Sequence, residues 1–326
     1  MNSLEYIDCS SLKNHRMLME EQWRIRKATI EDHNGIIELS EDSGYRNDFL
    51  DEYFPTVIKD PNACAYVAVV EEKIIGFFFT SIIDRGTTLV DRGSRVRKSY
   101  QKKGIISKLA LHVKLLQQGI VRSVATAART DLVMKTRRFN PITIRKCVIF
   151  QGNKSEFCGK IERDMDANVF TLTDTVLYSL MKRQSKYPKV FTDNHVVVFN
   201  VPYRLLETNV SLILTPWTCA LVSFIEEPSN TMVTFATNFR TRTGEIHFII
   251  DLYGTVNECL KTHILVHINK CFDRIQEKLV IEVRCCEPLG TIESVLISLG
   301  FQKPPSDKFT RNQLISFEYN HLTSSL

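Results

Sequence analysis

Residues 89–110, LVDRGSRVRKSYQKKGIISKLA, constrain the fold of this chain more than any other stretch. The pattern predicts a strand that ends at Val96, a basic turn that contains Gly104, and a helix that begins at Ile105, where apolar residues start to recur at helical spacing. A helix N-terminus offers unpaired N–H groups and the positive end of the helix dipole, and a glycine there lets a phosphate come close. The stretch is therefore either a cradle for a pyrophosphate or an ordinary strand–turn–helix with a solvated basic turn.

Length and cysteine usage limit the class of protein. The 326 residues predict two domains, and a hydrophobic content of 44% is enough for a packed core. The nine cysteines are odd in number and include no CxxC pair, so reduced thiols in the cytosol or nucleus are expected, and we predict a cytoplasmic location. Residues 1–21 do not resemble a secretory signal, and no apolar run reaches the length of a membrane span.

Charge and histidine spacing bear on the partners. The net charge of +5 is mild, and basic residues gather at 92–108 and 135–146, which a local anionic ligand explains better than a duplex footprint. His263 and His267 have the i, i+4 spacing of metal ligands, but their flanks are apolar and favour burial. We therefore expect a small-molecule partner and no nucleic acid, membrane or metal.

The basic turn resembles a known signature. Val96 followed by Gln101-Lys102-Lys103-Gly104-Ile105-Ile106 is similar to the acetyl-CoA motif Gln/Arg-x-x-Gly-x-Gly/Ala of the GNAT N-acetyltransferases. Gln101 and Gly104 match the motif, whereas Ile106 replaces its second small residue. The resemblance covers about half of the chain, from Trp23 to about Phe150. Over that range the predicted order of strand, two helices, three strands, helix and strand is that of the GNAT core.

Three short segments resemble the vertebrate histidine N-acetyltransferase-like group of this superfamily. They are Asp51–Pro55, Gly93–Val96 and Ala128–Asp131, and they occur in the family's order. The resemblance implies a cytosolic enzyme that acetylates the α-amino group of a free amino acid, which is histidine in the founding member.

The second half of the chain repeats a similar order of elements. Leu299-Gly300-Phe301 resembles the segment that ends the fourth helix of many GNAT domains. The corresponding cofactor turn, residues 253–258, lacks the Gln/Arg and the basic residues, and Glu258 would repel a pyrophosphate. We therefore predict an α/β (α+β) fold of tandem GNAT-like mixed sheets flanked by helices, with a degenerate second copy. The expected division is an N-terminal segment 1–21, a GNAT domain 22–151, a linker 152–168 and a degenerate GNAT-like domain 169–326.

The resemblance also implies the cofactor site, for acetyl-CoA as co-substrate. In GNAT folds the fourth and fifth strands separate, and pantetheine lies in the gap, where the N–H of Val96 would face the thioester oxygen. Backbone N–H groups from Gln101 to Ser107 would bind the pyrophosphate, with nearby cationic side chains as screening charges. The predicted cofactor residues are Val96, Arg97, Gln101, Lys102, Lys103, Gly104, Ile105, Ile106 and Ser107.

The predicted catalytic residues are Asp91 and Val96. Asp91 lies on the fourth strand, where many GNAT enzymes place a carboxylate, and would accept the amine proton through water. The alternative is a surface aspartate paired with Arg92 or Arg95. Many GNAT enzymes also use a tyrosine as the general acid, on the helix after the fifth strand. The corresponding region here, residues 134–139, has no tyrosine.

The predicted substrate residues are Glu52, Tyr53, Arg95 and Arg129. The two arginines would hold the carboxylate of an amino acid, since arginine binds carboxylates bidentately. Alternatively, Glu52 lies on a solvated helix face and Tyr53 packs in the core. The alternative for both arginines is that they face solvent or the cofactor phosphates. Two functions stay open: an N-acetyltransferase for a small free amino acid, or a catalytically impaired tandem GNAT-like protein that acts as a binding or scaffold partner. The sequence does not predict the oligomeric state.

Overall fold

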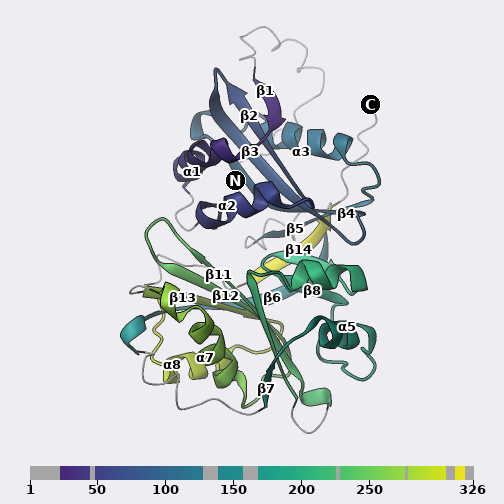
Figure 1. Ribbon diagram of the computed structural model, residues 1–326, viewed down its shortest axis with the longest axis vertical. Helices are drawn as coiled ribbons and strands as arrows, with labels where there is room; N and C mark the ends of the chain where they lie inside the picture. The colour runs from purple at the N-terminus through teal and green to yellow at the C-terminus, as the bar shows by residue number, and fades with distance from the viewer. Residues whose placement is uncertain are drawn as a thin grey trace, which may run out of the picture.

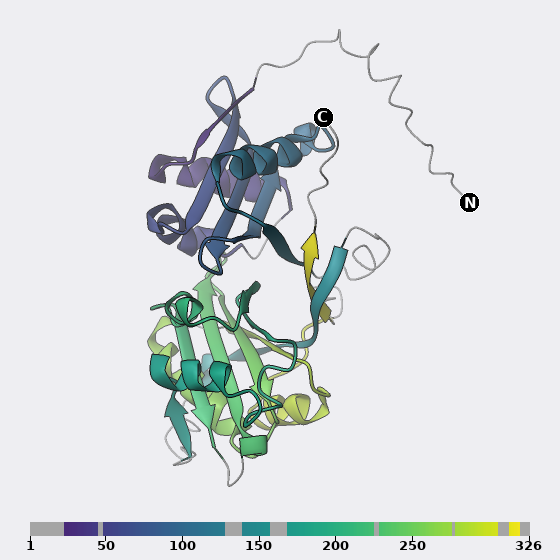
Figure 2. The same cartoon turned by 90° about the vertical axis from the view of Figure 1, so that its right-hand side faces the viewer.

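The computed structural model describes residues 23–44, 48–127, 139–156, 168–224, 228–275, 278–305 and 313–319. Its strands form one twelve-stranded mixed sheet and a separate two-stranded one, with helices on both faces (Figures 1 and 2). The order in the large sheet is β1-β2-β3-β4-β5-β14-β6-β13-β12-β11-β10-β7. The predicted fold class is confirmed.

The first half of the sheet contains the predicted strands. Its first four strands are antiparallel, and β5 is parallel to β4. Their bounds are β1 (Arg24–Lys27), β2 (Ala63–Val70), β3 (Lys73–Ile83), β4 (Thr88–Val96) and β5 (Arg122–Ala127). In β3, Phe77 and Phe79 pack on one face and Phe78 on the other, as expected for a central strand.

The second half repeats this arrangement. β10 and β11 are antiparallel, β11 and β12 are antiparallel, and β12 is parallel to β13, as β4 is to β5. The strands are β7 (Val169–Thr171), β10 (Thr218–Ser223), β11 (Met232–Arg240), β12 (Ile246–Gly254) and β13 (Lys278–Cys285).

Two strands join the halves. β14 (Gln313–Tyr319) lies between β5 and β6 (Phe139–Asn153), although it comes from the far end of the sequence. β6 pairs with β14 over residues 139–146 and with β13 over residues 146–153. The sheet therefore continues through the position where the sequence predicts the end of the first domain.

Helices cover both faces of each half. In the first half, α1 (His33–Asp42) and α2 (Leu50–Lys59) pack on one face and α3 (Ile105–Leu116) on the other. In the second half, the helices are α5 (Asp174–Lys182) and α6 (Val210–Ile213) on one face, and α7 (Leu260–Lys270) and α8 (Gly290–Ser298) on the other. Within the described ranges, no helix combines the length and the hydrophobicity that crossing a bilayer requires.

A hairpin precedes α6. It consists of β8 (His195–Val198) and β9 (Val201–Arg204), and a short 3-10 turn follows it before α6 begins. The two residues of the hairpin turn, Phe199 and Asn200, both have positive φ, 47° and 68°. A two-residue turn of this kind normally carries Asn or Gly at both positions, so Phe199 gave no hairpin signal.

Buried polar contacts also link the halves. Asn209 donates its amide to the Asp84 carboxylate at 2.7 Å and accepts the Asp84 backbone N–H at 3.1 Å. Arg122 donates to Glu318 of β14 at 2.8 Å. Because each of these side chains needs a partner from the other part of the chain, the contacts fix how the halves sit together.

A buried histidine pair lies in the second half. The Thr234 hydroxyl is 2.7 Å from His263 Nδ1 and 2.7 Å from His267 Nε2, and a hydroxyl can serve two neutral rings by donating to one and accepting from the other. Burial lowers the pKa of His263 to about 3 and puts the pKa of His267 well below its ordinary value of 6.5.

This pair should make the protein acid-sensitive. Below pH 6.5 the unfolded chain protonates both imidazoles while the native state keeps them neutral, so the free energy of unfolding falls as the pH falls. The pair should account for a loss of about 3 kcal/mol between pH 7.5 and pH 5.5. Urea denaturation at both pH values, compared with the double variant His263→Leu/His267→Leu, isolates this contribution. An equal pH dependence in the wild type and the variant would contradict it.

Candidate functional site

The site begins where β4 and β5 separate. The two strands pair only from Thr88–Arg122 to Asp91–Ala125, and residues 92–96 of β4 have no partner on the β5 side among the described residues. A β-bulge occurs at the same point, because Phe79 is opposite Gly93 while its neighbour Thr80 is opposite Asp91. Arg92 is thus the extra residue of the bulge, and bulges commonly redirect a side chain next to a functional site.

Val96 lies on the open edge of β4. The N–H of the next residue, Arg97, donates to Ile75 O of β3 at 3.0 Å. Because N–H groups alternate along a strand, the N–H of Val96 points away from β3 and toward the gap. The Val96 carbonyl accepts the Ser43 hydroxyl at 2.8 Å and the Gln101 amide at 3.4 Å. The free edge of β4 is therefore positioned to bind an extended ligand.

The basic turn ends on the N-terminus of α3. Gly104 is the N-cap with φ 74°, so the positive φ that this position requires is present, and a Cβ added there would meet no atom within 4 Å. The first helical hydrogen bond runs from Lys108 N to Gly104 O at 3.1 Å. The N–H groups of Ile105, Ile106 and Ser107 precede it and find no acceptor within the described part of the chain.

The polar residues around this helix start face solvent. Gln101, Lys102, Lys103 and Ser107 are exposed, and the Lys103 ammonium lies 4.6 Å from the centre of the Tyr100 ring. Arg97 differs, because its Nε and Nη2 both donate to Ile74 O at 3.3 Å. Three free N–H groups, a helix dipole and exposed lysines together suit a phosphate group.

A pocket of about 450 Å³, which we call the central pocket, lies beside the gap. Both halves line it, the first with Asp91, Arg92 and Arg95, and the second with His247 and Glu282. The predicted base, Asp91, therefore lies at the separation of β4 and β5 and faces a cavity.

Arg95 lines the central pocket but is engaged in the protein. Its Nε and Nη2 donate to the two carboxylate oxygens of Asp48, each at 2.9 Å, and Nη1 donates to Ser94 O at 3.0 Å. Both Arg95 and Asp48 are buried. A buried bidentate pair neutralises the guanidinium, so its fork is not open to a substrate carboxylate.

Glu52 does not line the central pocket. Its carboxylate accepts the backbone N–H of Arg240 at 2.6 Å and forms an ion pair with Arg274. Arg240 and Arg274 belong to the second half, so Glu52 joins the halves. These interface contacts occupy the Glu52 carboxylate, and its role in substrate binding stays a prediction.

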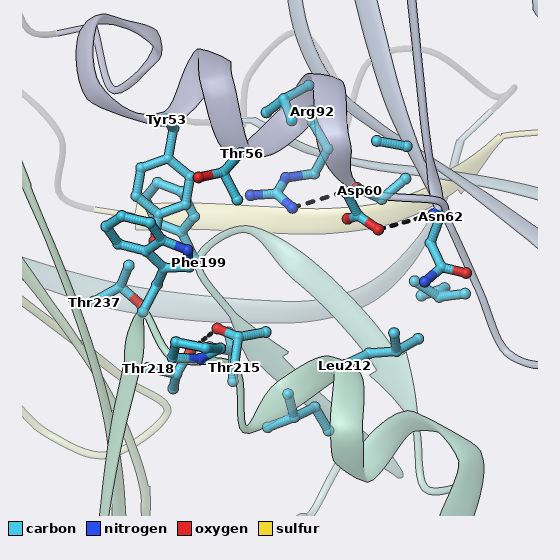
Figure 3. Close-up of a pocket in the computed structure, with 18 of the residues that line it drawn as sticks. Tyr53, Thr56, Asp60, Asn62, Arg92, Phe199, Leu212, Thr215, Thr218 and Thr237 are labelled. Atoms are coloured by element: carbon cyan, nitrogen blue, oxygen red, sulfur yellow. Dashed lines mark hydrogen bonds between the residues drawn. The ribbon is translucent and has the colours of Figure 1, made fainter.

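Tyr53 lines a second cavity, of about 510 Å³, which we call the lateral pocket (Figure 3). Its ring lies 5.0 Å from Trp217 and 5.4 Å from Phe199, measured between ring centres. Burial raises the pKa of Tyr53, so this phenol stays protonated. Arg92 and Phe199 line both pockets and form the boundary between them.

Two predicted features lie outside the described residues. One is Arg129, which the sequence predicts to bind substrate. The other is the stretch 134–138, where the sequence lacks the tyrosine that many GNAT enzymes have.

Sequence reasoning missed the residues that complete the site. Arg92 was weighed only as a partner of Asp91, because a bulge is set by strand pairing and leaves no local signal. Phe199 and Trp217 come from the second half, more than a hundred residues from Asp91 in sequence. Phe199 also has a positive φ, which a bulky residue rarely adopts. The sequence therefore gave no signal that Phe199 lies in a tight turn.

Comparison with known proteins fits this geometry. Residues 25–138 match the acetyltransferase (GNAT) family, and residues 166–286 match the family described as histidine N-acetyltransferase, C-terminal. No curated protein matches the sequence.

Two examples illustrate the likeness to solved structures. One is a tandem GNAT protein from the clavulanic acid biosynthesis pathway, solved without acetyl-CoA, with 9% identity, coverage of 91% of this chain and 98% of that chain, and a TM-score of 0.52. The other is a putative acetyltransferase from Pyrococcus horikoshii, with 13% identity, coverage of 94% and 92%, and a TM-score of 0.51. At such identities the likeness concerns the fold alone. The two family matches show that the chain joins a segment of the acetyltransferase (GNAT) family, residues 25–138, to a segment of the histidine N-acetyltransferase C-terminal family, residues 166–286.

Proposed function

We propose that this protein transfers an acetyl group from acetyl-CoA to the α-amino group of a small free amino acid, with L-histidine as the first candidate. The observation that carries the proposal is the open edge of β4 next to the free N-terminus of α3. Only the eight residues from Arg97 to Gly104 separate the two features in sequence, so one long ligand with a pyrophosphate and an extended arm could contact both.

The residues present fit acetyl-CoA. The N–H groups of Ile105, Ile106 and Ser107 would hold its pyrophosphate, and the space beside Gly104 leaves room for the phosphate oxygens. Ile106, which departs from the family motif, contributes its backbone N–H in the first turn of α3, and its side chain packs against the core beneath the helix. Acetyl-CoA supplies an activated acyl group with a thiolate leaving group.

The chain's own contribution is positioning and proton transfer. The N–H of Val96 would donate to the carbonyl oxygen that gains negative charge during acyl transfer. Asp91 would accept the proton of the acceptor ammonium, directly or through one water, since it lines the pocket at the gap. Residues of both halves line the central pocket, in which this step would take place.

A test separates acetyl transfer from a binding role. Acetyl-CoA at about 100 times its Kd should raise the free energy of unfolding by about 2.7 kcal/mol, seen as a thermal shift. Thiol release should then follow when a panel of free amino acids is added. The variant Asp91→Asn should lower kcat by at least about 100-fold with an unchanged KM for acetyl-CoA. Asp174→Asn, a change at an exposed carboxylate on α5, serves as the control.

The outcomes distinguish the two functions. A thermal shift without thiol release for any amine would contradict the proposed activity and favour a cofactor-binding scaffold. No shift at millimolar acetyl-CoA would contradict acetyl-CoA binding itself.

A further inference from the structure

The lateral pocket is lined by a half-buried arginine, Arg92, that forms no ion pair with a carboxylate among the described residues. Four arginines that are more deeply buried than Arg92 each have a carboxylate partner: Arg95 with Asp48, Arg122 with Glu318, Arg145 with Asp251 and Arg284 with Glu282, at 2.7 to 2.9 Å. Arg92 has none within 4.0 Å among the described residues, and its one hydrogen-bond acceptor there is the Ser81 hydroxyl, at the long distance of 3.5 Å.

Its surroundings are mostly aromatic. The guanidinium carbon lies 5.6 Å from the centre of the Phe79 ring and 5.3 Å from that of Phe199, on whose faces a cation is weakly stabilised. Asp60 attracts Arg92 through space but is exposed and accepts the Asn62 N–H at 2.8 Å. Figure 3 shows the guanidinium between Asp60 and the Tyr53–Phe199 pair. Burial lowers the pKa of Arg92, because the charged guanidinium loses part of its hydration. A bound anion would offset this loss of hydration.

The opposite wall is held in a strained conformation. Phe199 has φ 47°, and a bulky side chain in the left-handed region costs of order 1–3 kcal/mol. The backbone N–H of Phe199 donates to the buried Asp251 carboxylate at 3.0 Å, which holds the turn in place. The strained turn places the Phe199 ring between the two pockets, against Arg92 and 5.4 Å from Tyr53. Trp217 closes the same wall at 5.0 Å from Tyr53.

We propose that Arg92 binds the carboxylate of the acceptor amino acid and that the lateral pocket takes its side chain, between Tyr53, Phe199 and Trp217. This inference rests on the proposed function. An α-amino acid carries its amine and its carboxylate on the same carbon, so a carboxylate on Arg92 holds the amine at the boundary with the central pocket, which Asp91 lines. The aromatic walls suit a planar side chain over a branched aliphatic one. The second half of the chain thereby supplies acceptor specificity.

The test uses the variants Arg92→Gln and Arg92→Lys. Each is measured with the amino acid that gives the highest rate in the thiol-release panel and with the amine formed from it by decarboxylation (histidine and histamine, for example). Arg92→Gln should lower kcat/KM for the amino acid by at least about tenfold, because a charge-assisted contact is lost, and should change kcat/KM for the amine by less than about threefold. Arg92→Lys keeps the charge but loses the planar guanidinium. Its kcat/KM for the amino acid should lie between the values of the wild type and of Arg92→Gln. Arg204→Gln, on β9 with a side chain 47% exposed, is the control for loss of one positive charge.

A second measurement keeps the inference independent of turnover. Calorimetric titration of the same amino acid into the wild type and Arg92→Gln, with CoA present, should show binding to the wild type that weakens by at least about tenfold in the variant. Thiol release that keeps the wild-type preference for the amino acid over the amine in Arg92→Gln would overturn the inference and leave acetyl transfer standing. Amino-acid binding that depends on Arg92 without any thiol release would support the inference and contradict the proposed activity. Equal affinity in both proteins, or no binding to the wild type at millimolar concentration, would also overturn it.

Discussion

Replacing Gly104 with glutamate is expected to weaken acetyl-CoA binding by at least about 100-fold while the protein stays folded. The new carboxylate would stand at the N-cap of α3, beside the three free N–H groups that we assign to the pyrophosphate. It would compete for these N–H groups and repel the phosphates. Isothermal titration with acetyl-CoA measures the loss directly.

Gly119 provides a matched control at the other end of the same helix. It too has a positive φ, 87°, is exposed, and has no atom within 4 Å of an added Cβ. Gly119→Glu therefore imposes the same backbone strain and the same charge, and should leave the affinity within about twofold of the wild type. If Gly104→Glu binds acetyl-CoA as well as Gly119→Glu does, the pyrophosphate site lies elsewhere.

Replacing Ile315 with aspartate is expected to cost at least about 4 kcal/mol of the free energy of unfolding. Ile315 is at the middle of β14, has no exposed surface, and is opposite Ala127 of β5 on one side and Ile144 of β6 on the other. A charge at this place loses its water and disrupts the strand that joins the two halves of the sheet. Because β14 serves both halves, we expect them to unfold together.

Urea denaturation followed by circular dichroism gives the loss of stability. The control is Gln313→Asp, a change of similar chemistry at the exposed first residue of the same strand, which should stay within about 0.5 kcal/mol of the wild type. A small effect of Ile315→Asp, or a transition that leaves the first half folded, would show that β14 does not stabilise the sheet.

The sequence predicted the parts of the structure that depend on local pattern. The end of β4 at Val96 and the start of α3 at Ile105 are where the alternation and the helical spacing placed them. Gly104 has the left-handed conformation expected at that turn. These features follow from a few neighbouring residues, so a single sequence is enough to show them.

The features that the sequence did not predict depend on contacts between distant segments. The bulge at Arg92 results from the register between β3 and β4, and Glu52 and Arg95 have partners that only the folded chain brings near. For Glu52 the partner is 222 residues away. A carboxylate on a helix looks the same in sequence whether it meets a substrate, solvent or an arginine of the other half, so pattern alone could not decide its role.

The place of β14 in the sheet has a consequence for how the protein is made. On the ribosome, β5 and β6 emerge long before β14, so the central position between them stays open while all of the second half is synthesised. The nascent first half therefore presents two unpaired strand edges, of the kind that attract other extended chains, until the last described strand arrives. The sheet of the first half can therefore be completed only after the second half has been translated. Folding of the two halves is thus coupled during synthesis.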